Sequence, residues 1–299
     1  MNKKIPKYIS VFILVGLMVL LTKTTAHSKP AIDRAYYDSD TTQVLVIAHK
    51  GGDGLWPGNT IYAFRHAVKL GVDAIETDTH LTRDGVIVLL HDPRVDPTTN
   101  GTGLVEDMTL AEVKQLDAAY KWTPDDGKSF PFRGKGLTIP TLAETFQEFP
   151  HTRFVLDVKQ TRAPIAEPLC KLIHQYDMQN NVIVASLYDD IMRDFRNDCP
   201  EIATSASFSE VAAFVLTQRS DTAGLISPSY QALQGPYDPL GVYNSLIVTK
   251  NYVSEAHAKN LRVEPWADSV AAMKQCLADG ANGIITDRPD LLLELLKRK

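Results

Sequence analysis

Cysteine is scarce in this chain, with only three among 299 residues. Cys170, Cys199 and Cys276 lack the close pairwise spacing of zinc ligands, which argues against a cysteine-based metal site. Their number also allows at most one internal disulfide. Cys170 and Cys199 are the nearest pair in sequence, and two interpretations stay open: a disulfide between them, or buried free thiols throughout.

Several motifs of nucleophilic and nucleotide-dependent enzymes are missing. The sequence has no serine nucleophile elbow of the G-x-S-x-G type and no glycine-rich loop of the P-loop or Rossmann type. These absences argue against an α/β serine hydrolase and against enzymes built on either nucleotide-binding loop. Low-complexity tracts and short-period repeats are absent as well, so the chain does not resemble a repeat protein.

Positive charge is in short supply, with 31 Lys and Arg against 36 Asp and Glu and a formal net charge of −5. Because phosphate backbones are bound mainly by Lys and Arg, we expect no nucleic-acid partner. The remaining composition, 44% hydrophobic and 22% charged, is ordinary for a globular protein. The length allows one large α/β domain or two small ones.

Residues 1–26 have the pattern of a secretory signal: three lysines, the apolar run Tyr8–Leu21, and small residues ending at Ala26. We expect cleavage after Ala26 and export to the periplasm or the medium, with residues 27–43 as an N-terminal lead. The alternative is an uncleaved membrane anchor, although the run is short for a span of about 20 residues. No cysteine follows the run, which argues against lipoprotein processing. Removing residues 1–26 takes away four lysines and no acidic residue, so the net charge falls from −5 to −9.

Three apolar runs of β type end in polar residues that are able to do chemistry. The runs and the residues that follow them are Val44–Ala48 with His49, Ala74–Ile75 with Glu76 and Asp78, and Val86–Leu90 with His91 and Asp92. Ligands of parallel α/β proteins bind at the carboxyl ends of the strands. We therefore expect these side chains to form one site.

The carboxylates of Glu76 and Asp78 are the sharpest local signal. Residues i and i+2 of a strand share a face and lie about 6.6 Å apart, so both carboxylates are able to converge on one cation. All-oxygen ligation favours a hard cation, Ca²⁺ or Mg²⁺, over zinc. The alternative is an exposed edge strand with alternating polar residues, which the flanking histidine-ended runs disfavour. His80 continues the alternation and either contacts the metal or substrate or lies at the rim of the site.

The rest of the chain alternates strand and helix patterns, and about eight strands in roughly 250 residues predict a TIM (β/α)8 barrel over residues 44–299. Residues 93–140 are too long and polar for an ordinary connection, and they predict a small insertion after the third strand that lies over the barrel mouth. A helix is expected to begin near Ile61 with a cap from Asn59-Thr60. Later in the chain, Gly224–Ile226 is expected to form a strand and Ser227–Gly241 a loop at the barrel mouth.

Aromatic residues gather in the predicted insertion, at Tyr120, Trp122, Phe130 and Phe132. They either form an apolar wall for a substrate tail or pin the insertion to the body of the protein, and the sequence favours neither. Trp266, at the end of a later predicted strand, is expected to form a wall of the pocket.

Taken together, these segments resemble the glycerophosphodiester phosphodiesterase family. The chain has AHKGG…WPGNT, ETD and TRDGVIVLLHD where the family has a His-Arg-Gly start, a Pro-Glu-Asn-Thr element, a Glu-x-Asp strand and a His-Asp strand end. The segment RVEPWAD…GANGIITDRP resembles the family's ending, so the likeness covers essentially all of the chain from Val44. The resemblance implies a TIM barrel, a divalent cation and hydrolysis of a phosphodiester.

The resemblance also implies which residues hold the cation and the phosphate. Asp157 and Lys159 share a strand face where the family has Glu-x-Lys, so Asp157 would join Glu76 and Asp78 on the cation. Lys159 would then lie near the phosphate, together with Lys50.

Three positions depart from the family pattern. Lys50 stands where the family usually has Arg, and it loses the planar fork that binds phosphate by two parallel bonds. Gly58 stands where the family usually has Glu, which removes a carboxylate from the site. We hypothesise that these two changes compensate for each other. Asp157 stands for Glu and is one carbon shorter, so it reaches the cation less directly.

Catalysis would fall to His49 and His91. A histidine titrates near pH 6.5, which suits it to giving and taking protons at neutral pH. The two histidines would share the acid and base roles on opposite sides of the phosphorus atom. The resemblance further implies a cyclic phosphate intermediate, formed by attack of the neighbouring glycerol hydroxyl.

Three functions remain open at this point. The first is hydrolysis of soluble glycerophosphodiesters to glycerol 3-phosphate and an alcohol. The second is the same chemistry on lysophospholipids, which the aromatic insertion makes plausible. The third is a barrel that binds ligand or metal without turnover because Lys50, Gly58 and Asp157 are altered. Membrane contact is expected only through the N-terminal segment or a lipid substrate.

Overall fold

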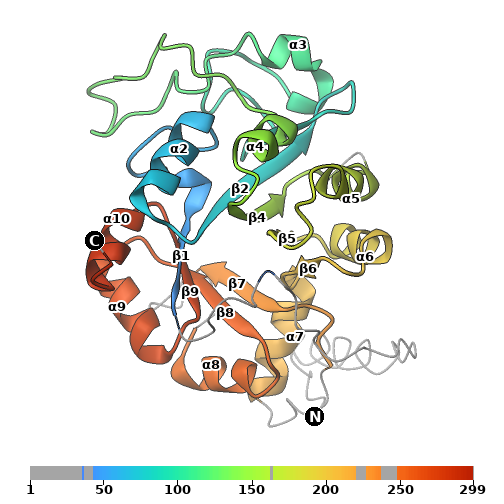
Figure 1. The fold of residues 1–299 in the computed structure, drawn as a ribbon, viewed down its shortest axis with the longest axis vertical. Coiled ribbons are helices and arrows are strands. Elements are labelled where there is room, and N and C mark those ends of the chain that lie inside the picture. The colour runs from blue at the N-terminus through green and yellow to red at the C-terminus, as the bar shows by residue number, and fades with distance from the viewer. Residues whose placement is uncertain (1–35, 37–42, 162–163, 220–226, 237–247, 299) are drawn as a thin grey trace, which may run out of the picture.

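A barrel of parallel strands forms the centre of the computed structural model, which describes residues 36, 43–161, 164–219, 227–236 and 248–298 (Figure 1). The barrel strands are β1 (Leu45–Ala48), β2 (Ala74–Leu81), β4 (Arg153–Val158), β5 (Val182–Ala185), β6 (Ala203–Thr204), β7 (Ala232–Pro236), β8 (Arg262–Trp266) and β9 (Gly283–Thr286). They pair in the order β6-β5-β4-β2-β1-β9-β8-β7. A parallel bridge between Ser205 and Ala232 links β6 to β7, so the barrel is nearly closed. The predicted TIM barrel is confirmed.

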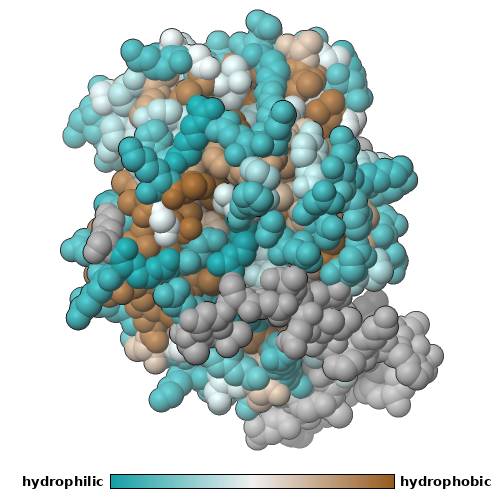
Figure 2. Space-filling model, viewed as in Figure 1, coloured by the Kyte–Doolittle hydropathy of each residue, from teal (hydrophilic) through white to brown (hydrophobic). Residues whose placement is uncertain are grey.

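Helices surround the strands, as Figure 1 shows in a view roughly along the barrel. They are α2 (Ile61–Leu70), α4 (Leu142–Glu148), α5 (Ala166–Gln175), α6 (Asp189–Asp198), α7 (Phe208–Arg219), α8 (Lys250–His257), α9 (Val270–Asp279) and α10 (Pro289–Leu295). Each barrel strand is followed by one of them. In the same view, Figure 2 shows hydrophilic residues over most of the surface, with hydrophobic residues gathered between α2 and α10.

Helix α2 begins and ends at the signals that the sequence carries. The Thr60 hydroxyl accepts a hydrogen bond from the Ala63 N–H at 3.1 Å, which satisfies a free donor of the first turn. Gly71 ends the helix in the left-handed conformation, with a φ of 92°. The cap is therefore Thr60 alone, and Asn59 turns its side chain elsewhere.

The third apolar run is a strand, β3 (Ile87–Leu89), but it does not belong to the barrel. It pairs antiparallel with the far end of β2, and Thr79 faces Leu89 in the register. The run was expected to deliver His91 at the end of a parallel strand. Instead β2 continues beyond its barrel pairs, and β3 returns alongside it, so that the Leu90 N–H donates to the Asp78 carbonyl at 3.1 Å.

The insertion follows β3 and contains two short helices, η3 (Val105–Asp107) and α3 (Leu110–Val113). In Figure 1 it lies at the top of the molecule, beside α2 and α4. A small apolar core of its own stabilises it, formed by Val88, Leu90, Val95, Val105, Val113 and Ile139.

The insertion's aromatic residues pack mainly against one another and against α2. Phe132 lies 5.2 Å from Trp122 and 5.0 Å from Tyr62, between ring centroids. The Arg133 guanidinium stacks on Tyr120 and Phe130 at 4.2 and 3.8 Å. Of the two interpretations, these contacts favour aromatic residues that pin the insertion to the barrel.

Three expectations fall on or beside parts of the chain that the structure does not describe. The signal segment 1–26 and the strand at 224–226 lie outside the described residues. The expected loop Ser227–Gly241 is wrong at Ala232–Pro236, where β7 pairs with β8 in spite of its glycine and proline, whereas residues 227–231 form no helix or strand. Within the described ranges, no helix is both long and apolar enough to span a membrane.

A disulfide joins Cys170 of α5 to Cys199, at the end of α6, with the two Cα atoms 5.9 Å apart. Of the two interpretations of this pair, the disulfide is therefore confirmed. Cys276 is a buried free thiol.

Replacing both bridging cysteines, in Cys170→Ser/Cys199→Ser, is expected to lower the free energy of unfolding. For a sequence separation of 29 residues, the chain-entropy model gives a loss of roughly 3–4 kcal/mol. Urea denaturation of the oxidised protein and of the variant measures it. The wild type under a reducing agent is the matched control and should unfold at the variant's midpoint; identical midpoints for oxidised and reduced wild type would contradict the prediction.

Candidate functional site

Glu76 and Asp78 of β2 and Asp157 of β4 form a carboxylate cluster in the barrel. Asp78 and Asp157 are register partners in the parallel ladder, and Glu76 lies two residues before Asp78 on the same face. Ligand oxygens of the three residues lie within 4.8 Å of one another. All three residues are buried, and β2 is paired on both sides, so the alternative of an exposed edge strand is wrong.

In each carboxylate, one oxygen accepts a hydrogen bond from the protein and the other accepts none. Glu76 Oε2 accepts from the Lys50 backbone N–H at 2.9 Å, Asp78 Oδ2 from Asn59 Nδ2 at 2.9 Å, and Asp157 Oδ2 from Lys159 Nζ at 2.7 Å. The second oxygens, Glu76 Oε1, Asp78 Oδ1 and Asp157 Oδ1, accept no hydrogen bond within the described residues. Buried polar atoms without partners are costly. Three buried carboxylates in such a cluster, each with an oxygen that accepts no hydrogen bond, fit a hard divalent cation.

The electrostatics of the cluster lead to the same conclusion. Burial raises the pKa of Glu76 to about 8, and the charge of Asp78 adds to the effect while His49 opposes it. Burial also raises the pKa of Asp157, against the attraction of Lys159. For Asp78, burial is outweighed by Lys159 and His91, so its pKa is lowered. Ionising all three acids together therefore requires added positive charge.

Lys159 supplies part of that charge. Its ammonium lies 2.7 Å from Asp157 Oδ2 and 3.4 Å from Asp78 Oδ1, and 6.0 Å from the centre of the Trp266 ring. Burial alone would lower the pKa of Lys159, but Asp157 and Asp78 outweigh it and raise the pKa. Lys159 is thus a cation at the edge of the cluster, where the sequence placed it.

His49 follows β1 in the short helix η2 (His49–Gly51) and is held on two sides. Its Nδ1 lies 2.6 Å from Asp287 Oδ1, and its Nε2 lies 3.8 Å from Glu76 Oε2. The ring packs 5.4 Å from the Trp266 ring, between centroids. Burial alone would lower the pKa of His49, but Glu76 and the hydrogen bond with Asp287 raise it to about 9.

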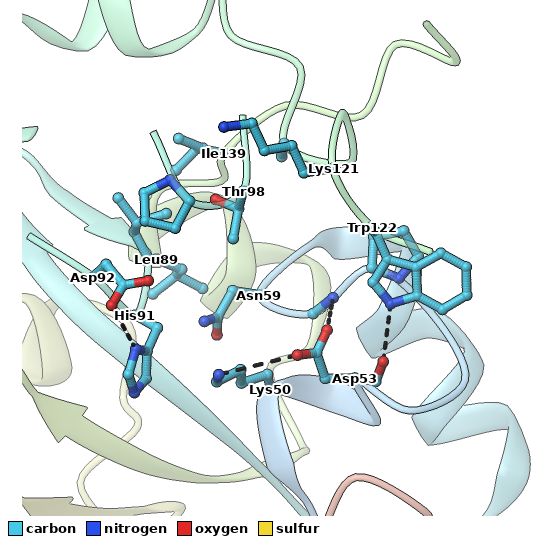
Figure 3. Close-up of a pocket in the computed structure, with 15 residues that line it drawn as sticks. Lys50, Asp53, Asn59, Leu89, His91, Asp92, Thr98, Lys121, Trp122 and Ile139 are labelled. Carbon is cyan, nitrogen blue, oxygen red and sulfur yellow. Dashed lines mark hydrogen bonds and ion pairs between the residues drawn. The ribbon is translucent and has the colours of Figure 1, made fainter. Parts of the chain in front are cut away.

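His91 reaches the site on the segment that follows β3, and its side chain is 41% exposed. It borders a polar cavity of about 200 Å³ that Lys50, Asn59, Asp92 and Trp122 also line (Figure 3). Its Nδ1 lies 3.3 Å from Asp92 Oδ1. The site therefore has one enclosed and one accessible histidine.

His80 matches neither of the expectations for it. It is buried, with Nδ1 3.2 Å from Gln160 Oε1 and Nε2 3.2 Å from the His91 carbonyl oxygen. Burial lowers its pKa, which keeps the ring neutral. His80 is a support for the backbone of His91, and it lies neither on the metal cluster nor at the rim.

Asn59 and Asp287 are site residues that the sequence analysis did not assign to the site. The Asn59 amide donates to Asp78 Oδ2, and its carbonyl accepts from the Thr77 hydroxyl at 2.7 Å. Asn59 adopts a left-handed backbone with a φ of 53°, which Asn tolerates better than most residues. The Asn-Thr pair following a turn was the available signal, but it was assigned to helix capping. Asp287 had no local signal beyond its place after the last strand.

A second cavity, of about 370 Å³, extends from the carboxylates between β4 and β8. Glu76 and Asp157 lie at its inner end. Its walls are mainly apolar, and they include Val155, Ala185, Leu187, Ala206, Phe208, Val211, Trp266 and Ile285. Trp266 is therefore a pocket wall, as expected from the sequence. It lines this apolar cavity and not the polar cavity beside His91.

The family assignment rests on a match over most of the chain. The model of the Glycerophosphoryl diester phosphodiesterase family matches residues 49–291. The chain belongs to this family. A glycerophosphodiester phosphodiesterase of Caldanaerobacter subterraneus is 33% identical over 262 residues, which cover 86% of this chain and 99% of that protein. This confirms the resemblance seen in the sequence.

More distant similarities are to a solved structure and to a further sequence. A phosphodiesterase of Oleispira antarctica, solved in complex with the product sn-glycerol-3-phosphate, superposes with a TM-score of 0.65 at 22% identity and covers 84% of this chain and 96% of its own. A lysophospholipase D of Mus musculus is 24% identical over 279 residues, covering 84% of this chain and 85% of that protein.

Removing the Asn59 amide is expected to weaken divalent cation binding about 10- to 100-fold, because Asp78 loses the donor that orients it. Asn59→Gly removes the side chain and tolerates the left-handed φ of 53°. Calorimetric titration of EDTA-stripped protein with Mg²⁺ or Ca²⁺ measures the affinity.

The matched control is Asn260→Gly, since Asn260 has a similar φ of 59° and precedes β8, away from the cluster. Equal affinities for the two variants would contradict the role of Asn59. If the unsubstituted protein bound neither cation, the cluster would not be a metal site.

Proposed function

We propose that this protein hydrolyses glycerophosphodiesters to glycerol 3-phosphate and an alcohol. The carboxylate cluster carries the proposal, because each acid keeps one buried oxygen that accepts no hydrogen bond, and Lys159 and His49 lie beside the cluster. The activity named for the Caldanaerobacter relative and the product bound by the Oleispira protein support the same substrate class. A barrel that only binds a ligand would not require this set of acids and bases.

Glu76, Asp78 and Asp157 would hold Ca²⁺ or Mg²⁺, which oxygen-only donors favour. When bound, the cation would polarise a phosphoryl oxygen as a Lewis acid. Lys159, beside Asp78 and Asp157, is placed to neutralise a second phosphoryl oxygen. Lys50 faces the polar cavity and would bind the phosphate from that side.

His49 and His91 would move the protons. Because Nδ1 of His49 is engaged by Asp287, Nε2 is the nitrogen that faces the cluster. Glu76 and Asp287 together raise the pKa of His49, so a cation that neutralised Glu76 would lower this pKa. His91 borders the polar cavity and is open to solvent, which suits exchange of a proton with water.

Each of the variants His49→Ala and His91→Ala is expected to lower kcat for glycerophosphocholine by about 10²- to 10⁴-fold, the usual contribution of general acid–base catalysis. Release of choline measures turnover, and Tm reports on folding. His151→Ala, at an exposed position outside the described cavities, is the control and should retain full activity. Near-wild-type turnover by either catalytic variant would refute this pair of roles.

A lysophospholipid substrate is the second candidate, and the apolar cavity favours it. The cavity leads from Glu76 and Asp157 to a rim where Leu187 is 61% and Phe208 57% exposed. An acyl chain would lie along this wall while the phosphate contacts the cluster. The insertion's aromatic residues, which the sequence offered for this role, are occupied with one another. One relative, from Mus musculus, is named a lysophospholipase D, which supports this substrate class.

Leu187→Asp would place a charge on the apolar rim and is expected to lower kcat/KM for lysophosphatidylcholine about tenfold to twentyfold, while leaving glycerophosphocholine nearly unchanged. Loss of contact with two methylene groups corresponds to about 1.6 kcal/mol, which sets this scale. Val68→Asp on α2, at a position 41% exposed, is the matched control. Parallel losses on both substrates would argue against an acyl site at this rim.

We also propose that the protein is exported. The Cys170–Cys199 disulfide supports the proposal, because structural disulfides persist mainly in oxidising compartments. The basic and apolar pattern of residues 1–26 is the second support.

A further inference from the structure

Gly58 is a position where a side chain is excluded by its neighbours and not by the backbone. The φ of Gly58 lies outside the left-handed region, so its backbone does not require glycine. A Cβ added there would lie 2.7 Å from Asp53 Oδ1 and 2.9 Å from the Lys50 Cβ. Real Cβ atoms essentially never approach other atoms this closely. The carboxylate of Asp53 therefore occupies the space that a side chain at position 58 would need.

Asp53 is fixed in this space by three hydrogen bonds, two of which Figure 3 shows. Its Oδ1 accepts from the Gly58 N–H at 2.9 Å, and its backbone carbonyl accepts from the Trp122 indole at 2.9 Å. Its backbone N–H donates to the His49 carbonyl at 3.2 Å. The remaining carboxylate oxygen, Oδ2, lies 4.0 Å from the Lys50 ammonium.

Lys50 is fixed at its backbone but long and flexible beyond it. Its φ is 51°, its N–H donates to Glu76 Oε2, and its carbonyl accepts from the Asn59 N–H at 2.9 Å. Within the part of the chain that the structure describes, Asp53 is the carboxylate that pairs with its ammonium. A lysine side chain has several rotatable bonds, so one fixed carboxylate nearby restricts where the charge lies.

We propose that Asp53 is a positioning residue, which holds the Lys50 ammonium at the polar cavity beside His91, and that it is able to do so because position 58 is glycine. The proposal rests on the proposed function in that Lys50 binds the phosphate of the substrate. The proposal explains both departures from the family pattern, Lys50 and Gly58, in the same way. Position 58 has no carboxylate, and Asp53 supplies one from another position in the loop. A partly exposed ion pair contributes little to folding stability, so the effect belongs to substrate binding and turnover.

Asp53→Asn tests the charge without changing the shape, because the amide oxygen still accepts from the Gly58 N–H. We expect kcat/KM for glycerophosphocholine to fall about tenfold to a hundredfold, since small misplacements of a binding group have effects of this size. Tm should stay at the wild-type value. Lys50→Met is expected to cost at least as much, and Asp53→Asn should cost nothing further in the Lys50→Met background.

Binding of glycerol 3-phosphate, measured by calorimetry, distinguishes positioning from simple charge. If Asp53 only repelled the phosphate, Asp53→Asn would bind it more tightly than the wild type does. If Asp53 positions Lys50, the variant binds it more weakly. Tighter binding, unchanged kcat/KM, or an equal cost of Asp53→Asn with and without Lys50 would each overturn the proposal. This measurement needs no turnover, so it tests the role of Asp53 even if the wild type hydrolyses no diester. Absence of hydrolysis would contradict only the proposed function.

A second pair of variants tests the dependence on Gly58. Gly58→Ala brings its Cβ against both Asp53 and the Lys50 Cβ and should lower kcat/KM, whereas the same substitution in an Asp53→Gly background, where only the Lys50 contact remains, should cost less. Asp53→Gly/Gly58→Glu returns a carboxylate to the emptied space and should recover most of the activity lost in Asp53→Gly. An equal cost of Gly58→Ala with and without the Asp53 side chain would show that the two positions are independent.

Discussion

Mutual repulsion of three buried carboxylates is the constraint on which the site depends. Glu76, Asp78 and Asp157 lie on adjacent strands and are buried, so little contact with water relieves their charge. The protein satisfies one oxygen of each carboxylate: a backbone N–H, a side-chain amide and an ammonium each donate a hydrogen bond to one of them. A half-satisfied polar network is less stable than an apolar core, so such a network persists where a ligand completes it.

The barrel makes this arrangement because parallel strands in register place equivalent residues side by side. Asp78 and Asp157 are neighbours across the ladder, and the two-residue period of β2 adds Glu76 to the same face. The loops after β1 and β9 then bring His49 and Asp287 together, although 238 residues separate them in the chain. Rigid strands thus hold the acids, and loops hold the two histidines proposed to move protons.

Local patterns in the sequence predicted what the strands do and missed what the loops do. Glu76, Asp78, Asp157 and Lys159 lie where the strand period and the family resemblance placed them, because strand geometry is regular. The contacts of Asn59 and Asp53 arise from irregular backbone. Lys50 and Asn59 adopt left-handed conformations, and these reverse the chain so that distant side chains meet, which no residue period describes.

The antiparallel pairing of β3 was missed for a related reason. An apolar run ending in His91 looks the same whichever way it pairs, since pattern alone does not fix strand direction. Residue pattern also misled within Ser227–Gly241, where proline and glycine indicated a loop but Ala232–Pro236 forms β7. The disulfide was left open because sequence spacing does not determine which cysteines meet in space.

Because β3 returns along β2, the site residues come from two separate parts of the protein. The acids and His49 belong to the barrel, while His91 arrives on a hairpin that continues into a segment with its own apolar core. A change in the outer segment would therefore alter the position of His91 or the shape of the entrance without disturbing the strands that carry the acids. Diversity among such enzymes is expected to concentrate in that outer segment.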